Sequence, residues 1–198
     1  MAQRVVLASN NAGKLREFGA LLGALDIELV PQAELGVPEA EEPEPTFVEN
    51  AILKARNAAR HTGLPALADD SGLEVDALDG APGVRSARYA GEDAGDADNV
   101  AHLLRELGAT PRNLRSARFV CVLVWLRHAE DPVPLIASGS WNGRILEAPQ
   151  GENGFGYDPV FYVPAHGCSA AELDPAQKNR ESHRAQALAA LYEALRSR

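Results

Sequence analysis

The residues most able to do chemistry begin with a polar turn that follows an apolar strand. Ser9-Asn10-Asn11-Ala12-Gly13-Lys14 comes directly after the strand-like stretch 4–8. A turn of this kind offers backbone N–H groups at the start of the next helix, where the helix dipole and Lys14 both favour a phosphate. The spacing of a P-loop is absent, because Leu15 follows Lys14 where a hydroxyl is required. The turn therefore predicts an anion cradle, although a plain strand-to-helix connection has the same pattern.

Two acidic segments supply carboxylates. Asp69-Asp70-Ser71-Gly72 follows the apolar stretch 64–67, and neighbouring residues at a strand end point in opposite directions, so we expect one of the two aspartates to face a ligand. Glu41 and Glu42 lie in a loop rich in Pro and Glu ahead of a helix. Carboxylates from separate segments suit a Mg²⁺ ion that keeps several waters. The alternatives are an Asx turn at the aspartates and a solvated loop at the glutamates.

A second Gly-rich segment, 151–159, has the sequence Gly-Glu-Asn-Gly-Phe-Gly-Tyr-Asp-Pro. Its glycines let the backbone approach a ligand closely, and Phe155 offers a flat face on which a base can stack. It lacks the order and the following helix of a dinucleotide-binding loop. The segment indicates a base site, with a structural turn as the alternative.

Cationic donors gather before the last helix, at Lys178 and in Ser182-His183-Arg184. Ser182 can cap that helix, and the Arg fork and the His ring can read carbonyl oxygens. Ordinary surface polarity is the alternative interpretation.

Composition limits the class of protein. The 198 residues are 45% hydrophobic, which suits one domain with a sizeable core. Nineteen basic against 28 acidic residues give a net charge of −9, which argues against nucleic-acid or anionic-membrane partners. Cys121 and Cys168 show no metal or disulfide spacing, and no segment reads as a signal or membrane span, so we expect a cytoplasmic protein.

Apolar periodicity predicts an α/β fold with a mixed sheet. A β-α pattern opens the chain, and a long hairpin follows later, with 139–143 expected to carry the chain across the sheet. Thr46 and Glu49 form a capping box for a helix that runs to Arg60. The expected strands are 4–8, 26–30, 64–67, 117–126, 135–141 and 160–163, and the expected helices lie near 15–25, 47–60, 98–107 and 182–195.

Taken together, these motifs resemble the inosine/xanthosine triphosphate pyrophosphatase family. The resemblance rests on the cradle 9–14, Thr46-Phe47-Val48-Glu49-Asn50-Ala51, Ala68-Asp69-Asp70-Ser71-Gly72, Gly154-Phe155-Gly156-Tyr157-Asp158 and Ser182-His183-Arg184. It implies a single domain over 1–198, with an elongated mixed sheet flanked by helices and two lobes around a central cleft. It also implies a homodimer that splits dITP, ITP or XTP into the monophosphate and pyrophosphate. Departures are small: Ser9, Asn10 and Asn153 stand where Thr, Gly and Gly are common.

The same resemblance implies the roles of the residues. Asp70 is the expected general base, with Asp69 beside it, and Mg²⁺ is expected on Asp70 with Glu42 or, next, Glu41. The triphosphate is expected on the cradle and Lys54. Base selection falls to donors that meet the 6-keto oxygen and reject an amine. The expected substrate-binding residues are Ser9, Asn10, Asn11, Ala12, Gly13, Lys14, Lys54, Ser71, Phe155, Gly156, Tyr157, Asp158, Lys178, His183 and Arg184.

Two other functions fit parts of the pattern. One is a pyrophosphatase for modified pyrimidine triphosphates, as in the related septum-inhibitor family. The other is a nucleotide-binding regulatory module without turnover, which would have no need for Asp70 together with Glu42 and a metal.

Overall fold

The structure is a computed structural model that describes residues 2–197, apart from the side chains of Ala12 and Glu17. The chain forms two compact units. Unit 1 contains the chain up to Asp70, Cys121–Gly139 and the chain from Gln186, and unit 2 contains Ser71–Val120 and Ser140–Ala185. Each unit has its own buried core.

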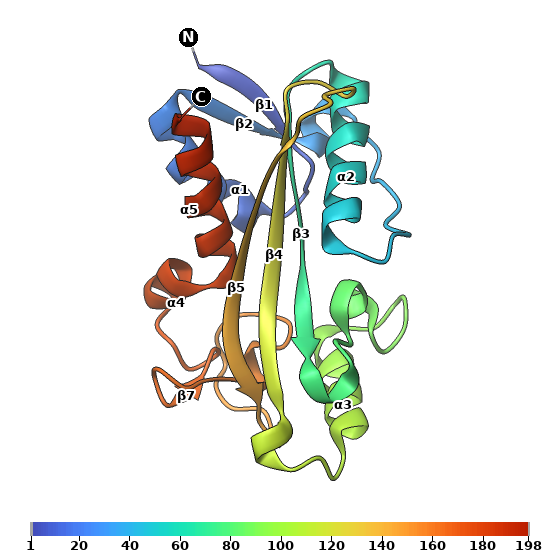
Figure 1. The fold of residues 1–198 in the computed structure, drawn as a ribbon, viewed down its shortest axis with the longest axis vertical. Coiled ribbons are helices and arrows are strands. Elements are labelled where there is room, and N and C mark those ends of the chain that lie inside the picture. Colours follow the sequence, from blue (N-terminus) through green and yellow to red (C-terminus); the bar gives the residue numbers. More distant parts are fainter. Residues whose placement is uncertain (1, 198) are drawn as a thin grey trace. The chain divides into compact units, whose positions relative to one another are not determined.

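Within the described residues, the strands form one seven-stranded sheet in the order β2-β1-β3-β4-β5-β6-β7 (Figure 1). Strand β1 runs parallel to β2 and β3, whereas β6 is antiparallel to β5 and β7, which confirms the predicted mixed sheet. The bounds are β1 (Gln3–Leu7), β2 (Ile27–Pro31), β3 (Ala66–Val75), β4 (Ser116–Leu126), β5 (Leu135–Ile145), β6 (Phe161–Val163) and β7 (Cys168–Ser169).

The helices are α1 (Ala12–Leu22), α2 (Phe47–Thr62), α3 (Asp96–Leu107), α4 (Pro175–Glu181) and α5 (His183–Arg196). Thr46 caps α2 as predicted, because its hydroxyl accepts the Glu49 N–H. Helix α4 was not predicted, although Asp174 caps it and Pro175 occupies its first position, which is a recognisable start signal. None of the helices in the described residues has the length and apolar composition needed to cross a membrane.

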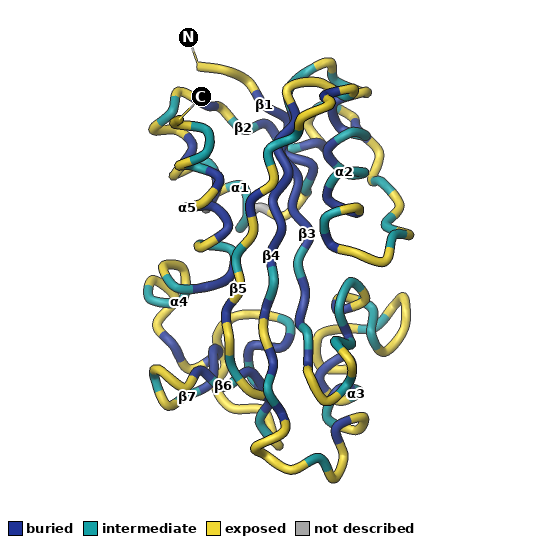
Figure 2. Tube along the Cα trace, in the orientation of Figure 1, coloured by how far each residue is buried: buried dark blue, intermediate teal, exposed yellow. Residues whose placement is uncertain are grey.

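The core of unit 1 lies between its strands and helices α1 and α5. Its members are Val5, Leu7, Phe18, Leu22, Ile27, Leu67, Cys121, Leu123, Trp125, Ala137, Ala187, Leu188 and Leu191. Helix α2 packs on β1 through a buried stripe of alanines. Figure 2 shows the buried positions following the strands of the unit, with the outer faces of α2 and α5 exposed.

The core of unit 2 joins α3 to β3, β4, β5 and β6. It includes Leu73, Val75, Val100, Leu103, Leu107, Phe119, Trp141, Ile145, Tyr157 and Phe161. Trp141 is therefore core, as Trp125 is in unit 1, and neither indole forms an exposed apolar face.

Two strands are longer than predicted. Strand β3 does not end at Asp69-Asp70 but runs on to Val75, because Leu73 and Val75 are needed in the core of unit 2. The predicted crossing at 139–143 is also wrong, since β5 continues to Ile145. Gly143 permits this path: a Cβ there would lie 2.5 Å from the Tyr162 carbonyl oxygen and 2.6 Å from Phe161 Cζ.

The turn between β4 and β5 is organised by one carboxylate, Asp131. Its oxygens accept the Arg127 N–H at 3.0 Å, the Arg127 guanidinium at 2.5 and 2.8 Å, and the Val133 N–H at 3.0 Å. Its side chain is almost wholly buried. Hydrogen bonds from Arg127 lower the pKa of Asp131 well below its usual range. The ionised carboxylate is therefore part of the folded turn.

We expect Asp131→Asn to lower the melting temperature at pH 7 by about 3–6 °C, because the amide cannot accept all of these hydrogen bonds. A lowered pKa in the folded state stabilises the protein above the unfolded pKa, near 3.8, and this stabilisation is lost as the pH falls further. The difference in melting temperature between wild type and variant should therefore become smaller below about pH 3.8. Thermal unfolding followed by circular dichroism at several pH values tests this, and a gap that does not depend on pH contradicts it.

Candidate functional site

The predicted cradle forms the start of helix α1 in unit 1. Asn11 is the N-cap, and its side-chain oxygen accepts the N–H groups of Gly13 at 2.8 Å and Lys14 at 3.1 Å. The Ser9 hydroxyl accepts the Asn11 N–H at 3.2 Å. The expectation that these helix-start N–H groups are free is thus incorrect for Gly13 and Lys14. An anion at this turn must bind the side chains or replace the Asn11 cap.

Five side chains of unit 1 form a lysine–carboxylate cluster: Lys14, Glu42, Lys54, Asp69 and Asp70. Lys14 Nζ lies 2.8 Å from Asp69 Oδ2. Lys54 Nζ lies 3.0 Å from Asp70 Oδ1 and 3.2 Å from Glu42 Oε1. The alternation of side chains along β3 sends the adjacent aspartates in opposite directions, and each meets a different lysine. Lys14 comes from the first turn of α1 and Lys54 from the middle of α2.

Burial and neighbouring charges shift the pKa values of two residues in this cluster. Burial raises the pKa of Asp70 above its usual range, and the opposing effect of Lys54 does not cancel the shift. Burial alone would lower the pKa of Lys54, but Asp70, Glu42 and Asp69 outweigh it and raise that pKa. Asp70 Oδ2 is buried and accepts no hydrogen bond. Asp70 is thus a carboxylate of increased basicity with one oxygen available to a ligand.

Two asparagines of helix α2 fix the acidic loop that carries Glu42. Asn50 is fully buried, accepts the Glu44 N–H at 3.0 Å and donates to the Glu44 carbonyl at 3.1 Å. Asn57 donates to the Pro38 carbonyl at 2.8 Å. These hydrogen bonds hold the loop at both ends, and the Glu42 side chain between them forms the ion pair with Lys54. Glu41 is exposed on the same loop.

A small polar cavity of about 170 Å³ joins the cradle to the cluster. Asn10, at its edge, donates to Glu39 Oε1 at 2.8 Å. Its lining is Ala8, Ser9, Asn10, Lys14, Gln32, Glu39, Ala40, Glu42, Lys54 and Asp69. Four of the residues predicted for phosphate binding thus line one cavity with Glu42 and Asp69, namely Ser9, Asn10, Lys14 and Lys54. Asp70 adjoins Asp69 and shares Lys54 with Glu42.

The carboxylates of the cluster fit a divalent cation. No group of three or more His, Cys, Asp or Glu side chains with metal-site geometry occurs in the described part of the chain. A Mg²⁺ ion needs only one or two protein carboxylates when water and phosphate oxygens supply its other ligands. Asp70 has a buried oxygen that accepts no hydrogen bond, and Glu42 contacts the same lysine. Glu42 and Asp70 are the side chains that would hold the ion.

A second group of predicted residues lies in unit 2, around the Gly-rich loop 151–159. The Phe155 ring is more than half exposed and lies beneath two cations: Lys178 Nζ is 4.9 Å and Arg184 Cζ 5.5 Å from its centroid. The Arg184 Nε atom is buried and makes no hydrogen bond. A flat ring beside an unpaired donor suits a planar ligand that carries a carbonyl oxygen.

Asp158 holds the turn of this loop. Its carboxylate accepts the Phe155 N–H at 2.8 Å and pairs with Lys178 Nζ. Gly154 has φ +81° and faces the Asp158 carboxylate so closely that a Cβ would clash with it. Asp158 is buried, so its role in this structure is to fix Phe155 and Lys178 relative to each other.

Two further predicted ligand residues of unit 2, besides Asp158, are buried. The Tyr157 ring lies in the core and its hydroxyl donates to the Ser86 carbonyl at 2.8 Å, so the side chain supports the loop from below. His183 begins α5 and stacks on Phe119, with ring centroids 4.9 Å apart. Ser71 is half-buried on β3, directly after Asp70.

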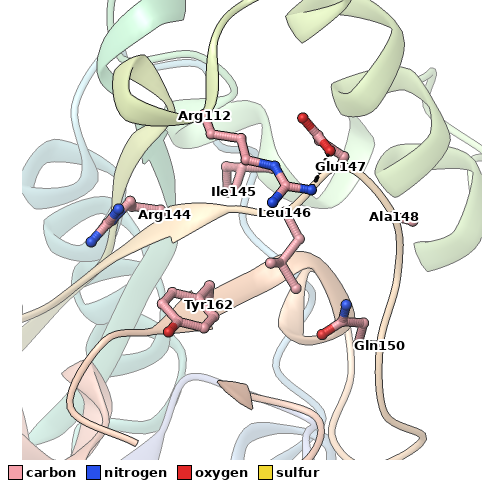
Figure 3. A pocket seen from close by; sticks show the side chains of 8 residues that line it. All are labelled: Arg112, Arg144, Ile145, Leu146, Glu147, Ala148, Gln150 and Tyr162. Atoms are coloured by element: carbon pink, nitrogen blue, oxygen red, sulfur yellow. Dashed lines mark hydrogen bonds and ion pairs between the residues drawn. The ribbon is translucent and has the colours of Figure 1, made fainter. Parts of the chain in front are cut away.

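A larger cavity in unit 2, of about 440 Å³, lies elsewhere (Figure 3). Arg112 and Glu147 form an ion pair of 2.6 Å on its wall, with Tyr162 below them. None of the residues predicted for the site lines it. This cavity therefore does not coincide with the predicted site.

Sequence reasoning missed several supporting residues. Glu39, Asn50 and Asn57 carry no signal of their own in the sequence. Their roles follow from the residues to which they hydrogen-bond in the structure. Asp96 was also missed: its carboxylate accepts the N–H of Gly156 from 60 positions away. No local signal in the sequence identifies such long-range contacts.

Comparison with known proteins gives a consistent result. A model of the Ham1 family matches residues 5–194. A curated protein of Bordetella pertussis named dITP/XTP pyrophosphatase is 64% identical over 98% of this chain and 92% of its own length. The solved structure of a HAM1 protein from Coxiella burnetii is 54% identical, covers 99% of this chain and 100% of that one, and has a TM-score of 0.95. The Staphylococcus aureus Ham1 protein is 42% identical over 98% and 99% of the two chains, with a TM-score of 0.90. With its fold and motifs matched over almost its whole length, this chain belongs to the Ham1 family.

Proposed function

We propose that this protein is a nucleoside triphosphate pyrophosphohydrolase that acts on deaminated purine nucleotides. Its substrates are dITP, ITP and XTP, and its products are the nucleoside monophosphate and pyrophosphate. Curated relatives that are 55–64% identical carry the name dITP/XTP pyrophosphatase. The activity removes deaminated purines from the nucleotide pool.

The observation that carries this proposal is the lysine–carboxylate cluster. Its two lysines can neutralise phosphate oxygens, and Asp70 keeps a buried oxygen for a water or an ion. In the reaction, a water attacks the α-phosphorus while Asp70 accepts its proton. The bond from the α-phosphorus to the bridging oxygen of the β-phosphate breaks, and pyrophosphate leaves. A raised pKa makes Asp70 a better proton acceptor than an ordinary aspartate.

Hydrolysis in this family is generally metal-dependent, and we assign the ion as Mg²⁺. When bound, the ion supplies positive charge that stabilises the phosphate oxygens as the leaving group departs. Glu42 and Asp70 would hold it, and the exposed Glu41 is the less favourable candidate. Lys14 and Lys54 keep the neighbouring carboxylates paired until substrate arrives.

Base recognition falls to the aromatic loop of unit 2. Phe155 stacks on the purine, and Arg184 and Lys178 donate toward the 6-keto oxygen of hypoxanthine or xanthine. Adenine carries an amino donor at that position, so a donor of the protein would face another donor and both would lose their hydrogen bonds. Ser71 and His183, together with the backbone of 155–158, complete the set of base-recognising residues in unit 2.

We further propose that the chain acts as one two-lobed domain and as a cytoplasmic homodimer, on the basis of its family membership. Its net charge of −9 disfavours nucleic acid as a partner. The phosphate ligand is therefore held by local cations and the metal ion.

Replacing Asp70 by Asn should remove the proton acceptor while keeping the shape of the side chain. We expect kcat for dITP to fall by about 100- to 10,000-fold, with nucleotide binding retained. Pyrophosphate release measures the first effect and equilibrium binding of dITP the second. Asp79→Asn is the matched control, because Asp79 is exposed at φ +50°, where Asn is tolerated. Normal hydrolysis of dITP by the Asp70 variant would show that Asp70 is not the general base.

Replacing Arg184 by Lys keeps the charge but removes the guanidinium fork. We expect kcat/KM for dITP to fall by about ten- to a hundredfold while the low value for dATP changes little. The ratio of the two kcat/KM values is the measurement. Arg180→Lys, on an exposed arginine of α4, is the control and should match the wild type. An equal fall for both nucleotides would mean that Arg184 does not read the base.

A further inference from the structure

The loop that carries Phe155 has little packing of its own. Residues 151–155 are all exposed, and a cavity of about 490 Å³ separates the loop from helix α3. That cavity is lined by α3 residues on one side and by 152–156, Pro149 and Pro159 on the other. A segment above a cavity depends on individual hydrogen bonds for its conformation.

One of those bonds comes from α3. Asp96, the first residue of that helix, accepts the Gly156 N–H through Oδ2 at 2.6 Å. The acceptor is charged and the bond is short, which places it among the stronger hydrogen bonds. Gly156 adopts φ +60° directly after Phe155, so this bond fixes the backbone at the residue that follows the stacking ring.

The other hydrogen bonds of the loop are made by different residues. The Asn153 N–H donates to the Ala171 carbonyl at 3.0 Å, and the Phe155 N–H donates to Asp158 at 2.8 Å. Asp158 is itself part of the loop, and because its carboxylate also pairs with Lys178, it connects Phe155 to helix α4 and not to α3. Asp96 is the side chain that anchors Gly156 to helix α3.

We propose that Asp96 is a positioning residue for base recognition. By holding Gly156, it keeps the Phe155 ring beneath Lys178 and Arg184, in the orientation that the purine needs. Asp96 contacts neither the cations nor the lysine–carboxylate cluster in any described interaction. Its loss should therefore weaken capture of the base and leave the hydrolytic step intact. This inference rests on the proposed function.

Helix α3 offers a matched control. Asp98 lies in the same first turn and accepts the Gly95 N–H at 3.1 Å, a local contact within the helix start. Asp96→Ala and Asp98→Ala each remove one carboxylate near the helix N-terminus, where negative charge is favourable. Asp96→Asn is the conservative variant, because its amide oxygen can still accept the Gly156 N–H without a charge.

The test is steady-state hydrolysis of dITP by the three variants and the wild type, with melting temperatures measured alongside. We expect Asp96→Ala to raise KM about five- to tenfold with kcat within about twofold, Asp96→Asn to give a smaller rise, and Asp98→Ala to leave KM unchanged. The two alanine variants should have similar melting temperatures, because each loses one exposed carboxylate.

Three results would overturn the proposal: an unchanged KM in Asp96→Ala, an equal rise in Asp98→Ala, or a loss confined to kcat. An inactive wild type on dITP would instead refute the proposed function. Equilibrium binding of deoxyinosine monophosphate gives the independent readout, and its Kd should rise with the KM of Asp96→Ala.

Discussion

The structure depends on the pairing of two adjacent carboxylates in one buried strand with lysines from two different helices. Asp69 and Asp70 are both nearly inaccessible, and an unpaired buried carboxylate is costly. Lys14 from α1 and Lys54 from α2 compensate them, so the positions of both helices are coupled to β3 by charge as well as by packing. The lysines that stabilise these carboxylates are also the ones that we propose for the phosphate oxygens.

The residues that we propose for catalysis and those that we propose for base recognition belong to different units of the chain. The lysine–carboxylate cluster belongs to unit 1, and the Phe155 loop with its cations belongs to unit 2. Each is held by hydrogen bonds from other side chains: Asn50 and Asn57 bind the acidic loop, and Asp158 and Asp96 bind the aromatic one. Loops held in this way keep defined positions for catalytic side chains although they have little core of their own.

Many of the elements and motif residues could be predicted from the sequence. Features that depend on contacts between distant residues could not. Periodicity identified the mixed α/β fold and most elements, and the Thr46 cap marked the start of α2. The sequence interpretation ended β3 too early, because a pair of aspartates is typical of a strand end. In the structure Lys14 and Lys54 pair with these aspartates, and the strand continues to residues buried in the core of unit 2. Likewise Tyr157 looked like a ligand residue, whereas the structure buries its ring and pairs its hydroxyl with Ser86. The motif residues could be found from residue type and spacing, but the residues that hold them in place through long-range hydrogen bonds could not.

We propose that this protein splits a keto-purine triphosphate at its α-phosphorus with the help of a divalent ion. Pyrophosphate release from dITP, XTP, dATP, dGTP and dTTP, each with Mg²⁺ and with EDTA, tests this reaction. We expect strong release that EDTA abolishes and that is confined to dITP and XTP. Preference for dTTP, release of orthophosphate in place of pyrophosphate, or turnover that persists in EDTA would contradict it.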